Sequence, residues 1–145
     1  MEDILKKIID IEYKLNSHEH TGVDFTNKLS VESGVYTPTY TAVSNIDGVT
    51  AYDAHYIKIG NVVSVAGKVD FNATATGDAQ FGISLPFGSN FNATEDCAGT
   101  FSEGQSVSSG MVTADTSNLR ANVRVNALSA SNRVATFIFM YRIIQ

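Results

Sequence analysis

Histidine, cysteine, proline and tryptophan are scarce in this chain of 145 residues. The single cysteine, Cys97, excludes an intrachain disulfide and gives no sign of an oxidising compartment. A net charge of −5 argues against a nucleic-acid partner, because such partners need clustered Lys and Arg. The longest apolar run near the C-terminus, residues 137–141, is too short to cross a bilayer, and MEDILKK is unlike a secretory signal. We therefore expect a soluble protein without membrane insertion.

What the chain does contain changes character once. With 43% hydrophobic residues, it is long enough to bury a core as about one domain. Residues 1–17 carry charge and a helical rhythm, whereas Gly, Ser, Thr and Asn dominate from about Gly34 onward with a period of two. Three parts are predicted: a helical stalk (1–17), an extended linker (18–33) and a β-rich head (34–145).

The apolar residues of the first segment alternate at spacings of three and four, as in the a/d seam of a coiled coil. This seam consists of Met1, Ile4, Ile8, Ile11 and Leu15. Lysines at g and glutamates at e are complementary in a parallel bundle, and isoleucine at both a and d favours three or four strands over two. The alternative is an amphipathic helix lying on its own domain, because Leu5 and Ile9 are apolar outside the seam and a helix of about 16 residues is marginal alone.

The head shows strand periodicity. Residues 63–71 and 119–127 alternate apolar with polar side chains, and further strands are expected at 35–44, 55–59, 81–85, 97–102 and 106–114. Turn signals stand between them, such as Asp47-Gly48. Many short strands without a helical pattern predict an antiparallel β-sandwich of the jelly-roll type.

The last expected strand, residues 133–143, is apolar on both faces. Ala135, Phe137, Phe139 and Tyr141 line one side, and Val134, Ile138 and Met140 line the other. Such a strand is either central between two layers or covered by a neighbouring subunit, and the second option agrees with a coiled coil.

Signals of catalysis are weak. Glu95 and Asp96 are adjacent, so on a strand they would point to opposite faces, unlike the facing carboxylates that glycoside hydrolysis uses. His55 alternates with Ile57 and Ile59, which predicts a structural histidine on a half-buried face, and Cys97 is expected in the core. We predict a protein that is not an enzyme.

The stretches SGVYTPTYT, YIKIGNVVSVAGKVDF, FGISLPFGSNF and TFIFMYRI resemble the C-terminal β-domain of bacteriophage tail-fibre and head-fibre proteins. The resemblance covers about residues 33–145. It implies a homotrimer located in the virion, with the N-terminus attached to another virion protein and the β-head presented outward.

Two function hypotheses stay open. An adhesin would bind a host surface glycan or protein through its outward loops, whereas a head-fibre decoration protein would be mainly structural. Counting strand directions from the linker places the loops near 45–48, 73–79, 103–105 and 128–132 at the end away from the stalk. The candidate receptor-facing residues there are Asn45, Asp47, Thr76, Asp78, Glu103, Ser129, Ser131 and Asn132.

Two of the three histidines lie at the end of the predicted stalk, in LNSHEHTG. The heptad places His18 at a d position, and an extended chain there would turn His20 to the axis as well. Six imidazoles in a trimer suit one octahedral transition metal, iron or nickel. The fibre resemblance implies the same, because H-x-H pairs in phage spikes bind an axial iron. The alternative is that the histidines cap the helix end.

Overall fold

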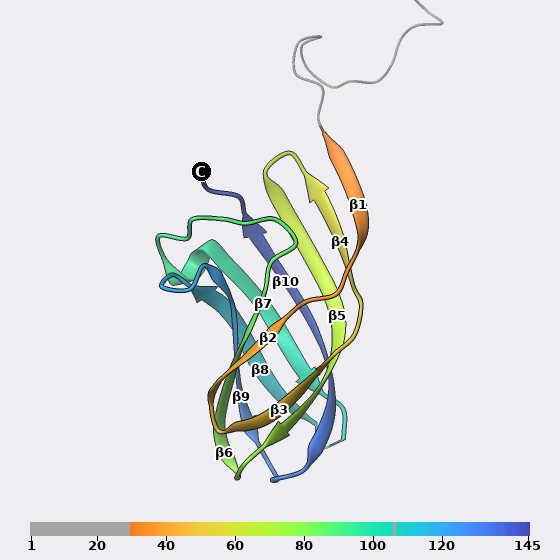
Figure 1. Cartoon of the computed structure of the whole chain (residues 1–145), viewed down its shortest axis with the longest axis vertical. Coiled ribbons are helices and arrows are strands. Elements are labelled where there is room, and N and C mark those ends of the chain that lie inside the picture. Colours follow the sequence, from red (N-terminus) through yellow and green to blue (C-terminus); the bar gives the residue numbers. More distant parts are fainter. Residues whose placement is uncertain (1–29, 106) are drawn as a thin grey trace, which may run out of the picture.

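The chain forms one antiparallel β-sheet in the computed structural model, which describes residues 30–105 and 107–145 (Figure 1). The elements of this part are β1 (Val31–Tyr36), β2 (Tyr40–Ser44), β3 (Ile46–Ala51), β4 (Ala54–Ile59), β5 (Val62–Ala73), β6 (Gly77–Ile83), the 3-10 turn η1 (Thr94–Asp96), β7 (Cys97–Glu103), β8 (Ser108–Asp115), β9 (Arg120–Ala127) and β10 (Asn132–Arg142). The prediction of a mainly antiparallel β protein is confirmed.

The sheet curls back on itself instead of dividing into two separate layers. Its strand order is β1-β4-β5-β10-β7-β8-β9-β6-β2, and β3 pairs with β5 off this path. Because β2 pairs with β6 and β3 pairs with β5, the corner between β2 and β3 bridges the two sides of the curl. The separate sheets expected for a jelly-roll sandwich are thus replaced by one continuous hydrogen-bonded sheet in the described residues.

The core lies inside this curl. Phe71, Phe81 and Phe101 come from three different strands and meet with ring centroids 5.5 to 6.0 Å apart. All three are at most 1% exposed. The alternation predicted for residues 63–71 is confirmed, because the apolar members of that strand point into this core. In the strand predicted at 119–127 the alternation holds from Ala121 onward, whereas Leu119 precedes β9 and is 43% exposed. Cys97 is also buried there, as expected, and burial raises the pKa of its thiol to about 12.

Two boundaries differ from those expected in the first half of the head. The strand predicted at 35–44 is divided into β1 and β2 by Thr37-Pro38-Thr39, where the buried Pro38 cannot donate to a ladder. Asp47-Gly48 lies inside β3, where the register shifts, and the chain reverses at Asn45 instead. Asn45 has a φ of 54°, which asparagine tolerates better than most residues do.

Two strands carry apolar side chains on the outside of the curl. In β10, Ala135, Phe137, Phe139 and Tyr141 are buried, whereas Val134, Ile138 and Met140 are exposed. In β4 the inward face is Ala54-Tyr56-Lys58, so His55, Ile57 and Ile59 point outward and are exposed. The half-buried face predicted for His55 is therefore exposed in a single chain.

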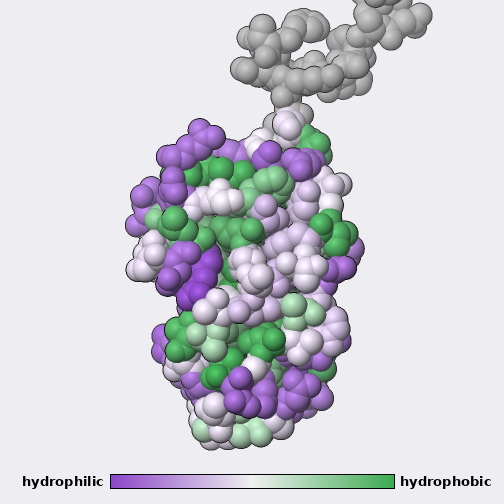
Figure 2. All heavy atoms as spheres, viewed as in Figure 1, coloured by the Kyte–Doolittle hydropathy of each residue, from purple (hydrophilic) through white to green (hydrophobic). Residues whose placement is uncertain are grey.

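The two ends of the head differ. Ser30, where the described chain begins, bonds to Gly60 at the same end as Ile143, whose N–H donates to Asn61. The β5–β6, β7–β8 and β9–β10 connections lie at the opposite end, which we call the loop end (Figure 1). Figure 2 shows that residues at the loop end are mostly hydrophilic or of intermediate hydropathy, whereas hydrophobic side chains gather in groups elsewhere on this face.

Candidate functional site

The three connections of the loop end are joined by the β2–β3 corner, where Asn45 bonds to Thr74 and Ala75 of the β5–β6 connection. Gly77 at the start of β6 lies opposite Ala127 at the end of β9, and Asn132 at the start of β10 lies opposite Asn72. Gly104 in the β7–β8 connection donates to the carbonyl of Val134. The stretches around 45–48, 73–79, 103–105 and 128–132 are thus neighbours in space.

Asn45 ties the β2–β3 corner to the β5–β6 turn. Its Oδ1 accepts from the Thr74 hydroxyl at 2.6 Å and from the Ala75 N–H at 2.8 Å. Its Nδ2 donates to the Ala75 carbonyl at 2.9 Å, and its own carbonyl accepts from the Thr74 N–H at 3.3 Å. These bonds use the polar atoms of the Asn45 side chain within the protein, so the residue serves to fix the turn.

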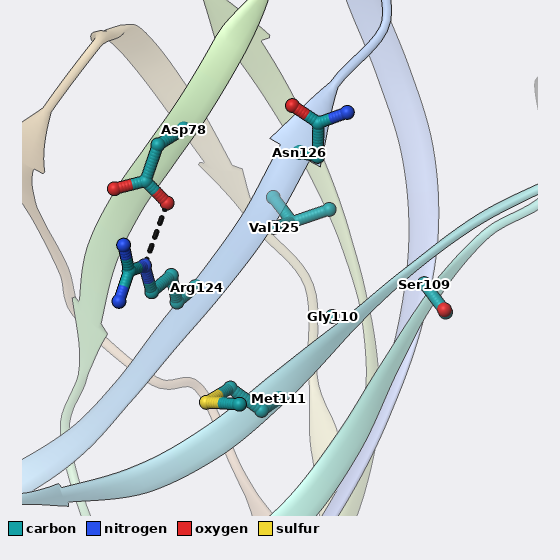
Figure 3. A pocket seen from close by; sticks show the side chains of 7 residues that line it. All are labelled: Asp78, Ser109, Gly110, Met111, Arg124, Val125 and Asn126. Atoms are coloured by element: carbon teal, nitrogen blue, oxygen red, sulfur yellow. Dashed lines mark hydrogen bonds and ion pairs between the residues drawn. The ribbon is translucent and has the colours of Figure 1, made fainter.

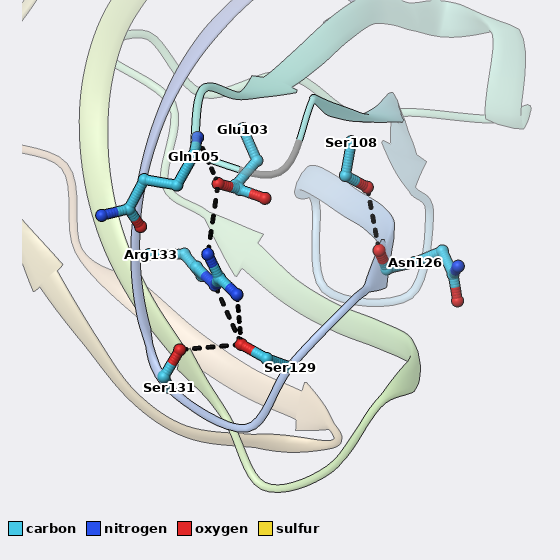
Figure 4. A network of polar contacts seen from close by, with 7 residues as sticks. All are labelled: Glu103, Gln105, Ser108, Asn126, Ser129, Ser131 and Arg133. Atoms are coloured by element: carbon cyan, nitrogen blue, oxygen red, sulfur yellow. Dashed lines mark hydrogen bonds and ion pairs between the residues drawn. The ribbon is translucent and has the colours of Figure 1, made fainter.

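A second group of polar contacts braces the β9–β10 connection (Figure 4). Arg133 Nη1 lies 4.0 Å from the carboxylate of Glu103, and Arg133 Nε donates to Ser129 at 3.1 Å. The hydroxyls of Ser129 and Ser131 are 2.7 Å apart. Glu103 is only 3% exposed and also accepts from the Gln105 N–H at 2.6 Å. Its carboxylate therefore faces inward and is unable to contact a receptor.

The remaining candidate residues of the loop end are exposed. These are Asp47, Thr76, Asp78, Ser131 and Asn132. Asp47 accepts a hydrogen bond from the Asn72 side chain at 3.3 Å. Thr76 lies in the β5–β6 turn, next to Ala75, which is bonded to Asn45. The structure thus presents a set of polar side chains on connections that are fixed by their neighbours.

Next to the loop end, a shallow pocket of about 420 Å³ lies on the outer face of β6, β9 and β8 (Figure 3). Arg124 Nε donates to Asp78 Oδ1 at 2.7 Å along one side. Met111 lies opposite Arg124 on the neighbouring strand β8, and beside it is the bare backbone of Gly110, where a Cβ would be 2.4 Å from the Arg124 carbonyl. The pocket therefore combines an ion pair with an apolar contact surface.

The sequence pointed to Asp78 but not to Arg124, Gly110 or Met111. Hydrogen bonds from Arg124 and Gln80 lower the pKa of Asp78, so its carboxylate stays ionised. Such a carboxylate is a hydrogen-bond acceptor and is poorly suited to act as a general acid. The pairing of β6 with β9 that brings Asp78 to Arg124 is long-range, so no local signal could have identified it.

The other sequence candidates are dispersed. Glu95 and Asp96 lie in η1, where Asp96 accepts from the N–H groups of Asn92 and Ala93, which lower its pKa. The predicted seam residues Ile4, Ile8, Ile11 and Leu15 and the predicted metal ligands His18 and His20 lie outside the described residues. Within residues 30–105 and 107–145, no group of three or more His, Cys, Asp or Glu is placed to hold a metal ion. The same residues include no helix long and apolar enough to cross a membrane.

Comparisons with models of protein families, with curated proteins and with solved structures give no match to this chain.

Proposed function

We propose that this protein is a non-enzymatic bacteriophage fibre or spike protein that binds a glycan or protein on the host cell surface during adsorption. In this proposal residues 1–17 form a trimeric coiled-coil stalk held by another virion protein, residues 18–33 form the linker, and the β-domain is the presented head. The observation that carries the proposal is that the two ends of the head differ: the described chain begins at one end (Figure 1), and braced polar loops occupy the other.

The composition of the loop end supports binding. Exposed carboxylate, amide and hydroxyl groups suit hydrogen bonding to sugar hydroxyls or to a protein surface, and Asn45 and Arg133 hold these loops in place. Fixed loops lose little conformational entropy on binding. Three heads on one stalk would also multiply a weak site, so millimolar affinity for each head can suffice.

Three of the described carboxylates are held as hydrogen-bond acceptors. The pKa of Asp78, of Asp96 and of Asp115 is lowered, in each case by hydrogen bonds from neighbouring groups. Glycoside hydrolysis needs one carboxylic acid with a raised pKa. These three carboxylates instead have the properties of structural or ligand-binding acceptors.

The proposal is tested with purified full-length protein on host cell envelopes and on a glycan array, with an assay for released reducing sugar. We expect binding without sugar release. Thr76→Ala/Asn132→Ala at the loop end should weaken binding, whereas the control Thr116→Ala/Ser117→Ala, in the exposed β8–β9 turn at the other end, should leave it unchanged.

Two results would change the assignment. Release of reducing ends would make the protein an enzyme. Absence of binding, together with location of the protein on the capsid of intact virions, would favour the alternative of a head-fibre decoration protein with a mainly structural role.

A further inference from the structure

The outer face of the sheet carries a group of exposed hydrophobic side chains on β1, β4, β5 and β10. Six of them are 43 to 55% exposed: Val35, Ile57, Ile59, Val62, Ile138 and Met140. In Figure 2 hydrophobic residues are visible along the edge of the molecule where β1 and β4 lie in Figure 1. We call this group the apolar face.

The strand registers show that these residues are neighbours. Met140 of β10 lies opposite Ser64 of β5, and Ser64 lies opposite Ile57 of β4. Ile138 is connected in the same way through Ala66 to His55, which lies opposite Val35 of β1. Neighbouring strands are about 4.8 Å apart, so a row from β1 to β10 is roughly 15 Å across. A surface of this kind on a single chain indicates an interaction site.

Asp, Glu, Lys and Arg side chains are absent from the middle of the apolar face. The two residues that separate Met140 from Ile57 and Ile138 from His55 are Ser64 and Ala66, and the next strand, β7, contributes Ala98 and Thr100 opposite Met140 and Ile138. Arg142 and Lys68 stand at the two margins along β10 and β5. A neutral centre with charged margins is typical of protein–protein interfaces.

The fold of the head does not itself require these outward side chains. The inner faces of the same strands already supply the core, since Val63, Val65, Phe137 and Phe139 are at most 4% exposed. A solvated outer face would normally carry polar residues, as it does on β9, where Asn122, Arg124 and Asn126 alternate with buried residues. The apolar face therefore has a purpose beyond the stability of one head.

We infer that the apolar face is the surface through which the heads of neighbouring copies of this chain pack around a common axis. The inference rests on the trimer of the proposed function and names the part of the head that joins its subunits. β4, β5 and β10 then turn towards the axis, and the loop end points along it.

The place where the described chain begins favours a second copy of this chain as the occupant of the apolar face. β1 begins at Val31, which is 64% exposed and lies opposite Ile59 at the border of the apolar face. The predicted seam ends at Leu15, and the residues from there to Val31 span at most about 55 Å when fully extended. A parallel seam on the axis thus keeps three heads within reach of one another, each with its apolar face next to the point of entry. Copies related by a rotation axis offer the same patch at the same height.

The first test compares the mass of three full-length proteins by light scattering at micromolar concentration. The wild type should have the mass of three chains. Ile138→Asp/Met140→Asp should lower the mass threefold, because six carboxylates would be brought together at the interface. Val43→Asp/Leu128→Asp is the matched control, because both residues are 49% exposed and lie outside the apolar face; it should keep the wild-type mass. Circular dichroism should show the same β signal in all three.

Thiol accessibility is a second test of the interface, which does not depend on the folding of the charged variant. Ile57→Cys and Leu128→Cys each add one thiol, and the native Cys97 does not interfere because it is fully buried. A bulky maleimide should modify position 57 at least tenfold more slowly than position 128 in the native protein, and equally fast after unfolding.

Three results would overturn the inference. If Ile138→Asp/Met140→Asp is still a trimer and the maleimide modifies position 57 as fast as position 128, the trimer forms through another surface. A monomeric wild type would remove the trimer and this interface together, while the envelope-binding assay would still decide on host binding. A monomer with position 57 shielded would place the chain's own residues 1–29 on the apolar face.

Discussion

Replacement of Asn45 should loosen the loop end, because this residue combines a positive φ with three side-chain hydrogen bonds to the β5–β6 turn. Asn45→Ala removes all three bonds. Each exposed hydrogen bond contributes about 0.5–1 kcal/mol net, since water replaces it in the variant. Alanine at a φ of 54° adds about 1 kcal/mol of backbone strain. The free energy of unfolding should therefore fall by about 2.5–4 kcal/mol, equivalent to roughly 5–15 °C in melting temperature.

Two further variants separate the contributions. Asn45→Gly accepts the positive φ without strain but lacks the side chain, so it should be less destabilising than Asn45→Ala by about 1 kcal/mol. Asn45→Asp keeps the acceptor for Thr74 and Ala75, but its second carboxylate oxygen faces the Ala75 carbonyl where Nδ2 donates in the wild type, so this variant should also be destabilising.

The assay is denaturant unfolding at one fixed protein concentration, because association of the chains would make the midpoint depend on concentration. Amide hydrogen exchange at Ala75 gives the local readout, since its N–H donates to Asn45. If Asn45→Ala unfolds at the wild-type midpoint and the Ala75 amide exchanges no faster, then Asn45 does not hold the turn.

Three other changes have clear expectations. Gly99→Ala places a Cβ 2.2 Å from the Ile138 carbonyl and should separate β7 from β10, with a loss of several kcal/mol in urea unfolding, whereas Gly48→Ala meets nothing within 4 Å and should unfold like the wild type. Burial alone would raise the pKa of Asp115, but hydrogen bonds from Asn118 and Arg120 lower it below 3.8. The loss of stability caused by Arg120→Gln should therefore be constant at neutral pH and shrink as the pH falls below 3.8. An equal loss at pH 2 and pH 7 in unfolding curves would contradict this. Elemental analysis of the dialysed protein should find about one iron or nickel per three chains, lost in His18→Ala/His20→Ala, and a metal-free protein whose melting is unchanged by chelator would remove this site.

The periodicity of the sequence was sufficient where a strand has one apolar and one polar face. In β9, Ala121, Val123 and Val125 are buried and the residues between them point outward, because a period of two admits one assignment of faces there. The residue at which the chain reverses between β2 and β3 could not be predicted from periodicity. Asp47-Gly48 is the stronger local turn signal, but the tertiary bonds of Asn45 to Thr74 and Ala75 decide where the chain reverses.

In β4, the same periodicity gave the face of His55, Ile57 and Ile59 correctly as one unit but not its direction. The opposite face supplies Ala54, which is fully buried, and Tyr56, whose ring lies edge-on to Phe87 with the centroids 5.1 Å apart. Tyr56 is amphipathic and Ala54 is small, so neither stands out in a hydrophobic pattern. A strand with two apolar faces has no unique direction in the sequence, and only the packing of the whole sheet assigns it.

The strength of the apolar face bears on how the proposed trimer forms. Its six side chains are each about half exposed, so full burial would contribute about 1 kcal/mol for each, or about 6 kcal/mol for a subunit. The loss of translational and rotational freedom on association costs from about 4 to more than 15 kcal/mol, so the apolar face alone gives weak association. A stalk helix of about 16 residues is also marginal alone. When both are present in one chain, either contact raises the effective concentration of the other, and two weak associations become one stable assembly.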